Sequence, residues 1–324
     1  MILMFKLLCK LIFGCCIIIS YARSEVEKIE FMSANPFSLK DIIVDLDTQK
    51  FQLVTAILEY PANLNKEKIP LVIGVAGSYG WGDHHLRYLK MYRDMGIATL
   101  MLESFSSRNV TSTVGTQNTV TTAMIVLDSY KALEKISENT KIDIEKVAIT
   151  GWSLGGGVAL IAAWKPIIEA INSNYEFAAH LSYYPPCFIR SDNLNYSSSP
   201  IHILIGELDD WVPSAACEEL INLMKKNGIN ADITIYKDAH HSFDREDGLN
   251  IAKNGYKFSD CRFKLSDQGE ILMNYINIPM SNPLLQKIGF ATCAERGPTY
   301  GGHLESRKKS FEFSRNFMQK YLLN

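Results

Sequence analysis

The stretch Lys146-Val-Ala-Ile-Thr-Gly-Trp-Ser153-Leu-Gly-Gly-Gly157 decides the fold of this chain. An apolar run typical of a β-strand leads into the pattern Gly-x-Ser-x-Gly, and an apolar run typical of a helix follows it. A strand, a tight turn and a helix in this order form a nucleophile elbow, which needs glycines because side chains there would collide with neighbouring backbone. We therefore predict that Ser153 is a nucleophile. The alternative is a glycine-rich turn that only lets a helix pack closely against a strand.

Two downstream segments supply an acid and a base in the order Ser, Asp, His that this architecture requires. A strand of the buried type at residues 200–206 ends in an acidic turn that contains Asp209 and Asp210. After one more helix and strand, a polar loop carries His240 and His241. We expect both loops at the same edge of the sheet, where an imidazole accepts the serine proton and a carboxylate fixes the imidazole tautomer.

Three sequence blocks together resemble the dienelactone hydrolase family of α/β-hydrolases, from roughly Pro70 to the final helix. The blocks are Gly-Trp-Ser-Leu-Gly-Gly-Gly, Gly-Glu-Leu-Asp-Asp-Trp-Val-Pro and Tyr-Lys-Asp-Ala-His-His-Ser-Phe. The family patterns D-x-x-V-P and A-x-H-S-F select Asp209 as the acid and His241 as the base. Asp210 is then interpreted as a helix cap, and His240 as a supporting or surface residue. The resemblance implies the α/β-hydrolase fold, a doubly wound and mostly parallel sheet with helices on both faces.

The chain departs from this family pattern in two ways. The namesake enzymes carry Cys as the nucleophile, whereas this chain carries Ser153. The acidic residue that they place near the first oxyanion loop has no counterpart in the segment Val75-Ala-Gly-Ser-Tyr-Gly80. Lactone specificity is therefore not implied.

Acyl transfer also needs hydrogen-bond donors for the developing oxyanion. The backbone N–H of Leu154 is one candidate, because the start of the following helix directs its free N–H groups there. The segment Gly77-Ser78-Tyr79-Gly80 resembles the H-G-x-x-G loop of many hydrolases, with Ala76 in place of the usual His. We expect the second donor to be the N–H of Ser78, with Gly77 as the second choice, unless this loop is a plain β-to-α turn.

The composition indicates one large catalytic domain that needs no cofactor. The chain has 324 residues, of which 47% are hydrophobic, and no linker-like run divides it. The net charge of −2 leaves no basic excess for nucleic acid. No Walker loop, dinucleotide fingerprint or zinc-type Cys/His cluster is present, so neither a cofactor nor a metal is expected. Asp83-His84-His85 lacks the i, i+4 spacing of a helical metal site and is interpreted as a helix start.

The first 22 residues are typical of a secretory signal peptide. Lys6 and Lys10 precede the apolar run 11–19, and Ser20-Tyr-Ala22 has small residues at the spacing of a cleavage site. Cleavage would leave residues 23–324 as an exported hydrolase domain, periplasmic or secreted, without stable insertion in a membrane. An uncleaved membrane anchor is the alternative.

Four cysteines remain after that segment, and they permit three pairings. We predict the pairs Cys261 with Cys293 and Cys187 with Cys217, because disulfides form in an oxidising compartment. The first pair would fasten an insertion at roughly residues 244–303, beside the histidine loop. The alternative is four buried free thiols.

Three further expectations concern residues outside the triad. Arg108 is expected to ion-pair with Glu103 or a neighbouring loop, or else to hold a substrate carboxylate. In the helix before Gly96, the side chains of Leu86, Leu89, Tyr92 and Met95 are expected to form the buried face. In the final helix that face is expected to consist of Phe313, Phe317 and Tyr321.

The residues and the resemblance together predict an exported serine hydrolase that acts on a small-molecule acyl substrate. Ser153 would attack an ester or related acyl carbon, His241 would move the proton, Asp209 would orient His241, and water would resolve the acyl-enzyme. Two alternatives stay open. One is an acyltransferase or peptidase with the same triad, and the other is a secreted binding module that kept the fold without the activity.

Overall fold

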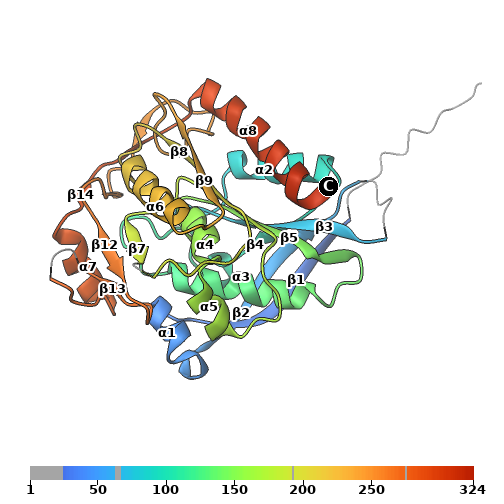
Figure 1. The fold of residues 1–324 in the computed structure, drawn as a ribbon, viewed down its shortest axis with the longest axis horizontal. Coiled ribbons are helices and arrows are strands. Elements are labelled where there is room, and N and C mark those ends of the chain that lie inside the picture. Colours follow the sequence, from blue (N-terminus) through green and yellow to red (C-terminus); the bar gives the residue numbers. More distant parts are fainter. Residues whose placement is uncertain (1–24, 63–66, 192, 274–275) are drawn as a thin grey trace, which may run out of the picture.

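The structure is a computed structural model that describes residues 25–62, 67–191, 193–273 and 276–324. The predicted signal peptide, residues 1–22, lies outside the described residues. An eight-stranded sheet forms the centre of the molecule, in the order β1-β2-β4-β3-β5-β6-β8-β9 (Figure 1). Its strands are β1 (Val26–Ala34), β2 (Phe51–Glu59), β3 (Ile69–Val75), β4 (Ala98–Leu102), β5 (Ile142–Trp152), β6 (Ala179–Tyr183), β8 (Ile201–Gly206) and β9 (Ala231–Tyr236).

One strand of this sheet, β2, runs opposite to the other seven. The first pair, β1 and β2, is antiparallel, and β2 also runs antiparallel to β4. From β4 to β9 every neighbour is parallel. All seven residues of β3 are buried, as expected for a parallel strand covered on both faces.

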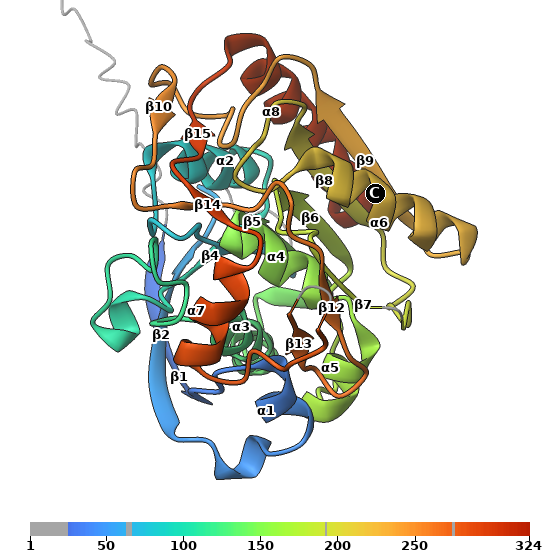
Figure 2. The ribbon, with the colours of Figure 1, turned by 90° about the vertical axis from the view of Figure 1, so that its left-hand side faces the viewer.

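Helices cover both faces of the sheet because successive strands are added on one side of β3 as far as β4 and on the other side from β5 onward. The connections are right-handed, so the helix between β3 and β4 lies on one face, and those that follow β4, β5 and β8 lie on the other. Figures 1 and 2 show α2 with α8 on one side, and α3 with α4 on the opposite side. The helices are α1 (Leu39–Ile43), α2 (Asp83–Asp94), α3 (Thr122–Ile136), α4 (Leu154–Ile161), α5 (Lys165–Ile171), α6 (Ser214–Lys226), α7 (Pro283–Ala291) and α8 (Leu304–Met318), with short 3-10 turns at Leu46–Thr48 and Ser106–Arg108 and a final turn at Gln319–Leu323.

Phe313, Phe317 and Tyr321 pack against the core as predicted, but serines make up most of the buried face of α8. Phe317 is buried, but Phe313 and Tyr321 are half-buried, and a row of small serines faces the sheet: Ser306, Ser310 and Ser314. Small side chains at i, i+4 and i+8 allow the helix to lie close to two buried tyrosines. The Tyr88 hydroxyl is 2.6 Å from the Ser310 hydroxyl, and the Tyr183 hydroxyl is hydrogen-bonded to the Ser314 hydroxyl.

The buried face of α2 was also partly mispredicted. Leu89 and Tyr92 are buried as expected, but Leu86 is 41% exposed. His84 and His85 are buried instead. Hydrophobicity is therefore an incomplete guide to this helix, because two imidazoles take the place of an apolar residue in the packing.

The segment between β9 and α8 forms a small subdomain against the C-terminal edge of the sheet (Figure 2). Two disulfides lie in or beside it, Cys261–Cys293 within the segment and Cys187–Cys217 next to it. These are the two pairings put forward from the sequence. Besides α7, its elements are the short strands β10 (Asn250–Ile251), β11 (Tyr256–Lys257), β12 (Phe263–Leu265), β13 (Ile271–Leu272), β14 (Glu295–Arg296) and β15 (Thr299–Tyr300), and β12 pairs with β7 (Ile189–Ser191) of the main domain.

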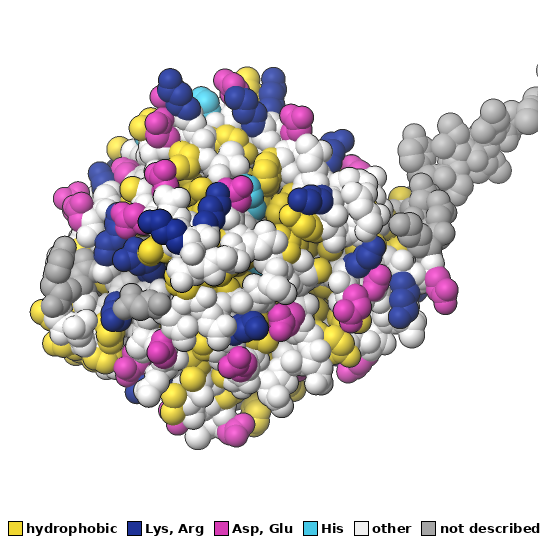
Figure 3. Space-filling view, viewed as in Figure 1, with side chains coloured by type: hydrophobic (Ala, Val, Ile, Leu, Met, Phe, Trp, Pro, Cys, Tyr) yellow, Lys and Arg dark blue, Asp and Glu magenta, His cyan; other side chains and the backbone are white. Residues whose placement is uncertain are grey.

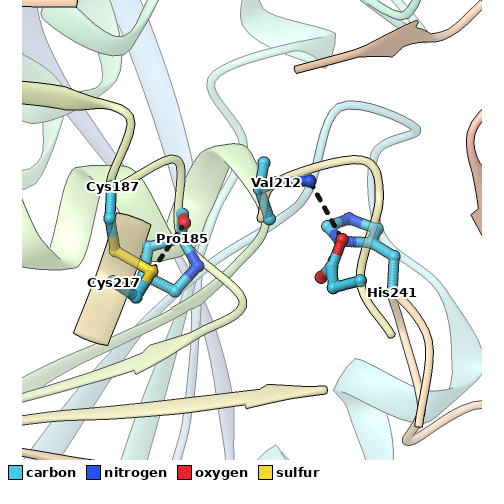
Figure 4. Close-up of a disulfide and its surroundings, with 6 residues drawn as sticks. Pro185, Cys187, Val212, Cys217 and His241 are labelled. Carbon is cyan, nitrogen blue, oxygen red and sulfur yellow. Dashed lines mark hydrogen bonds and ion pairs between the residues drawn. A yellow bond between two sulfur atoms is a disulfide. The ribbon is translucent and has the colours of Figure 1, made fainter. Parts of the chain in front are cut away.

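The Cys187–Cys217 disulfide connects the loop that follows β6 to α6. In Figure 4 it lies beside Pro185, whose carbonyl oxygen is 3.4 Å from Cys217 Sγ, with Val212 and His241 on the other side of the view. The next residue along the chain, Phe188, stacks on Phe258 of the subdomain with ring centroids 4.5 Å apart. This disulfide therefore fixes the loop on which the subdomain packs.

On the face drawn in Figure 3, basic and acidic side chains are interspersed over the surface. Within the described residues, no helix has the length and apolar character needed to cross a membrane.

Candidate active site

Ser153 occupies the turn between β5 and α4 with a backbone that L-residues rarely adopt. Its φ is 55° and its ψ is −112°. A Cβ on Gly151 would lie 2.1 Å from the carbonyl oxygen of Gly155, and a Cβ on Gly155 would lie 2.2 Å from that of Val75. Both distances are far below any real contact, so the backbone can turn this tightly only with glycine at both positions.

Ser153, His241 and Asp209 form one hydrogen-bonded line. The Asp209 carboxylate accepts a hydrogen bond of 2.7 Å from the His241 Nδ1–H. Because the proton is on Nδ1, Nε2 is free to accept a hydrogen bond from the Ser153 hydroxyl, which lies 3.0 Å away. Asp209 and His241 are buried and Ser153 is half-buried, so only the serine end of this line meets the solvent.

The surroundings of Asp209 act on its charge in opposing directions. Burial raises the pKa of this carboxyl group, whereas His241 and the backbone N–H groups of Trp211 and Val212 lower it. Those two N–H groups donate to the second carboxylate oxygen at 3.0 and 2.9 Å. With both oxygens occupied by donors, the carboxylate is held in one orientation toward the imidazole.

Two aromatic rings contact the imidazole of His241, and sequence reasoning missed both. The centroid of Trp211 is 5.0 Å away and that of Tyr184 is 4.6 Å away. The Tyr184 hydroxyl donates a hydrogen bond of 2.8 Å to buried Asp244. Tyr184 follows β6 directly, and an aromatic residue at the carboxyl end of a parallel strand was the available signal.

Asp210 and His240 have partners that the sequence did not indicate. Asp210 was expected to cap a helix, but its carboxylate accepts from both the N–H and the hydroxyl of Thr299, at 2.8 and 2.9 Å, and lies 3.3 Å from the Lys257 ammonium. His240 Nδ1 also lies 2.8 Å from the Thr299 hydroxyl. No side chain caps α6, whose N-cap is Pro213, and Asp209 instead accepts from the N–H groups of the turn that precedes this helix. Asp210 and His240 anchor the subdomain.

The two expected oxyanion donors lie beside Ser153. Leu154 is the first residue of α4, and Ser78 lies in the turn that a Gly77–Gly80 bridge closes after β3. A Cβ on Gly77 would lie 3.5 Å from the Cβ of Ser153, so this turn is packed against the nucleophile. Ser78, Ser153 and Leu154 border the same pocket.

Arg108 is turned away from this site. Its guanidinium binds both carboxylate oxygens of Asp128, at 2.7 and 3.0 Å, and also donates to Asn35. The expected pairing with Glu103 is wrong, because Asp128 on α3 is fully buried and needs a cationic partner, whereas Glu103 bonds to Ser106. An arginine engaged in this way has no donor pair left for a substrate carboxylate.

The histidine pair at the start of α2 has a structural role. His85 packs against Trp152 with ring centroids 4.5 Å apart, and its Nδ1 accepts from the Gly82 N–H. Burial lowers the pKa of both His84 and His85. Within the described residues, no cluster of three or more His, Cys, Asp or Glu side chains is arranged to hold a metal ion.

A pocket of about 130 Å³ opens at Ser153. Its lining comes from several parts of the chain that are distant in sequence, and among the described lining residues none is charged. The lining residues are Phe37, Ser38, Leu39, Ser78, Gln117, Thr121, Thr122, Ala123, Ser153, Leu154, Gly157, Leu160, Ile161, Pro186, Phe188, Ile189, Trp211, Val212, Phe258, Ile271, Met280, Gln286 and Phe290.

The sheet order, the strand–turn–helix around Ser153 and the hydrogen-bonded Ser-His-Asp line are those of an α/β-hydrolase. The model of the dienelactone hydrolase family matches residues 92–259, just over half of the chain, and this range contains all three residues of the line. The chain belongs to the dienelactone hydrolase family.

Comparisons with individual proteins agree with this assignment. A probable 2-oxo-3-(5-oxofuran-2-ylidene)propanoate lactonase from Bradyrhizobium sp. is 26% identical over 127 residues, which cover 37% of this chain and 48% of that protein. The match thus spans about half the length of this curated relative.

Two solved structures share the fold. One is a dienelactone hydrolase-like promiscuous phosphotriesterase from metagenomic libraries, with a TM-score of 0.55, 12% identity and coverage of 92% of this chain and 99% of that chain. The other is named m3DLH, with a TM-score of 0.57, 13% identity and the same coverage. At these identities the likeness concerns the fold alone.

Proposed function

We propose that the protein is a serine hydrolase that cleaves a carboxylic ester or a related acyl bond. The observation that carries the proposal is the hydrogen-bonded line from the Ser153 hydroxyl through His241 to Asp209, with the serine on a strained turn that faces a pocket. Membership of a hydrolase family supports it. The lactone named for the Bradyrhizobium protein is not carried over, because the matched stretch is short and the nucleophile block departs from the lactone-cleaving pattern.

The reaction would proceed in two halves. His241 Nε2 takes the proton of Ser153 while Oγ attacks the acyl carbon, and the backbone N–H groups of Leu154 and Ser78 bind the oxyanion. The C–O bond to the leaving alkoxide then breaks as His241 returns the proton to it. Water, deprotonated by the same imidazole, attacks the acyl-enzyme and releases the acid and free Ser153. Asp209 stabilises the imidazolium in both halves.

We also propose that the protein is exported and that its active form contains both disulfides. The sequence of residues 1–22 and the Cys187–Cys217 and Cys261–Cys293 pairs support this. Non-reducing peptide mapping of protein exported in its own host tests it. Recovery of all four cysteines as free thiols would contradict the proposal.

Labelling with a serine-directed fluorophosphonate tests the catalytic proposal. We expect the wild type to be labelled on Ser153, Ser153→Ala to lose both labelling and ester turnover while it keeps its melting temperature, and Ser198→Ala, at an exposed serine, to behave as the wild type. An unlabelled wild type would favour the binding-module alternative. Turnover measured with alcohol or amine acceptors in place of water separates hydrolysis from acyl transfer.

A further inference from the structure

The direction of the pocket is defined by one face of α4. Besides Ser153 and Leu154, the helix contributes Gly157, Leu160 and Ile161, which recur at three- and four-residue steps and so share a face. From Leu154 to Ile161 the helix rises about 10 Å. The pocket therefore begins at the nucleophile and follows α4 toward its C-terminal end.

The far end of the pocket lies where α1 meets the subdomain. Helix α1 contacts α5, which begins just after α4 ends. A Cβ on Gly269 would lie 2.6 Å from the backbone of Leu39, so the turn before β13 is packed against α1. Ile271, two residues after Gly269, lines the pocket together with Leu39, and Figure 2 shows β13 and α7 above α1.

The chemistry of the lining is apolar and neutral. The subdomain contributes Ile271, Met280 and Phe290, and the polar side chains of the whole lining are neutral hydroxyls and two amides. One of these amides, Gln286, donates from Nε2 to the carbonyl oxygen of Gln117 at 3.1 Å. Among the described residues of the lining there is no cation to bind a carboxylate and no anion to bind an amine. A charged group transferred into such a pocket would lose its hydration without compensation.

The position of His241 distinguishes the two sides of an ester. The base must stand next to the leaving oxygen, because it returns the proton there. Trp211 and Val212 border the pocket near Ser153, whereas His241 itself does not line it. The pocket is therefore on the acyl side of the nucleophile, and the alcohol leaves on the histidine side.

We infer that the pocket binds the acyl chain of an uncharged ester, with room for about eight carbons. This inference rests on the proposed hydrolase function. A C–C bond of about 1.5 Å advances an extended chain by roughly 1.25 Å per carbon, so a channel of about 10 Å accepts about eight of them. The volume of about 130 Å³ is near the roughly 150 Å³ of an apolar cavity that holds the six carbons of benzene. About six carbons of the chain would therefore be enclosed, and the others would lie at the opening toward Ser153.

Four esters test separately the length of the chain, the side of the ester on which it lies and its lack of charge. Ethyl octanoate and octyl acetate are isomers that exchange the long chain between the acyl and alcohol sides. Ethyl acetate lacks the chain, and monoethyl suberate adds a terminal carboxylate to it. We expect kcat/KM for ethyl octanoate to exceed that of ethyl acetate by at least ~30-fold and that of the other two by at least ~10-fold, because each buried methylene contributes and a buried carboxylate opposes binding.

A substitution in the pocket identifies the residues responsible. Ile271→Trp adds bulk at the far end of the pocket from a half-buried position, and we expect it to lower the ratio of kcat/KM for ethyl octanoate to kcat/KM for ethyl acetate at least ~10-fold. Ile288→Trp is the matched control, because Ile288 is 47% exposed on α7 and lies outside the lining. If Ile271→Trp fails to fold, the kcat/KM values of the wild type for the four esters still test whether the pocket binds an uncharged acyl chain.

The outcomes are distinguishable. If kcat/KM for ethyl acetate or monoethyl suberate equals that for ethyl octanoate, the acyl-pocket proposal is wrong, while the proposed hydrolase function is unaffected. A preference for octyl acetate would assign the pocket to the alcohol. No turnover of any ester, together with no fluorophosphonate labelling of Ser153, would overturn both the hydrolase and the acyl pocket.

Discussion

The backbone of Ser153 is held in an unfavourable conformation by its neighbours. A non-glycine residue at such angles costs about 1–3 kcal/mol. The Ser153 N–H donates to the Tyr183 carbonyl at 2.9 Å, and its own carbonyl accepts from the Gly157 N–H at 2.9 Å. These bonds join the turn to β6 and to α4. These bonds to the sheet and to α4 hold Ser153 in its strained backbone conformation. The hydroxyl therefore points at His241 before the reaction begins and needs no rearrangement during it.

Substitution of the acid and the base should separate the two adjacent candidates at each position. We expect Asp209→Asn and His241→Ala each to lower kcat by at least ~10³-fold, because they remove the tautomer control and the proton acceptor. Asp210→Asn and His240→Ala should change kcat less than ~3-fold, since their partner is Thr299. Steady-state kinetics on one activated ester checks this. A severe loss in His240→Ala with activity retained in His241→Ala would reverse the assignment.

The Arg108–Asp128 pair should be far more important for stability than the ion pairs on the surface. Asp128 is fully buried and also accepts from the Ser33 and Ser104 hydroxyls. We expect Asp128→Ala to lower the free energy of unfolding by about 3–5 kcal/mol, because it leaves a buried guanidinium unpaired. Asp94→Ala, which breaks the exposed pair with Lys90, should cost less than ~0.5 kcal/mol. Similar urea midpoints for the two variants would contradict this account.

At the scale of elements, the subdomain depends on crosslinks and aromatic packing more than on regular structure. Its strands have two or three residues each. Phe258 and Phe290 pack with centroids 5.0 Å apart, and Cys261 is completely buried between the short strands. Strands this short bury little surface by pairing, so the wall of the pocket is held by these side chains and by the disulfide.

Removal of the Cys261–Cys293 disulfide should destabilise the protein without removing the catalytic line. The bond closes a loop with a sequence separation of 32, which corresponds to about 4 kcal/mol in the chain-entropy model. We expect Cys261→Ala combined with Cys293→Ala to lower the free energy of unfolding by that amount, while ethyl acetate turnover persists. Urea unfolding and steady-state rates check the two parts. An unchanged midpoint would show that packing alone fixes the subdomain.

At the scale of the whole molecule, two imidazoles on the central sheet, the buried one of His180 and the half-buried one of His202, couple the fold to pH. Burial lowers the pKa of both His180 and His202 to about 4. His180 Nδ1 lies 2.9 Å from the Ala159 carbonyl, to which it donates, and its Nε2 has no partner within the described residues. Both side chains lie on strands of the central sheet. A proton on either imidazole would therefore place a positive charge against the packed core and destabilise the folded protein.

Stability should therefore decrease as the pH falls. An imidazole with a lower pKa in the folded protein binds fewer protons there than in the unfolded chain, so its contribution is complete above pH about 6.5 and is lost toward pH 4. For His180 this amounts to about 3 kcal/mol, and the raised pKa of Asp209 offsets part of the loss.

Urea unfolding between pH 7.5 and 4.5 measures this dependence. We expect the slope of the free energy of unfolding against pH to be shallower in His180→Asn, whose amide nitrogen corresponds in position to Nδ1, keeps an N–H donor for Ala159 and cannot titrate. Equal slopes for the two proteins would exclude His180 as a source of the acid sensitivity.

The sequence by itself determined the strand–turn–helix around Ser153, the order of the three blocks and the alternation that gives a mostly parallel sheet. These features follow from local sterics and periodicity. The glycines at 151 and 155 and the apolar runs each predict a local structure that depends only on residues a few positions away. The catalytic roles of Ser153, His241 and Asp209 stay predictions.

Only the tertiary structure decided the partners that lie far apart in the chain. It brought Asp128 to Arg108, turned Asp210 and His240 toward Thr299, and placed the serines of α8 against the tyrosines. It also closed the pocket with α1 and α7, whose sequences carry no sign of that role. The physical reason is that burial and pairing depend on which distant elements meet, and no periodicity within a segment encodes that meeting.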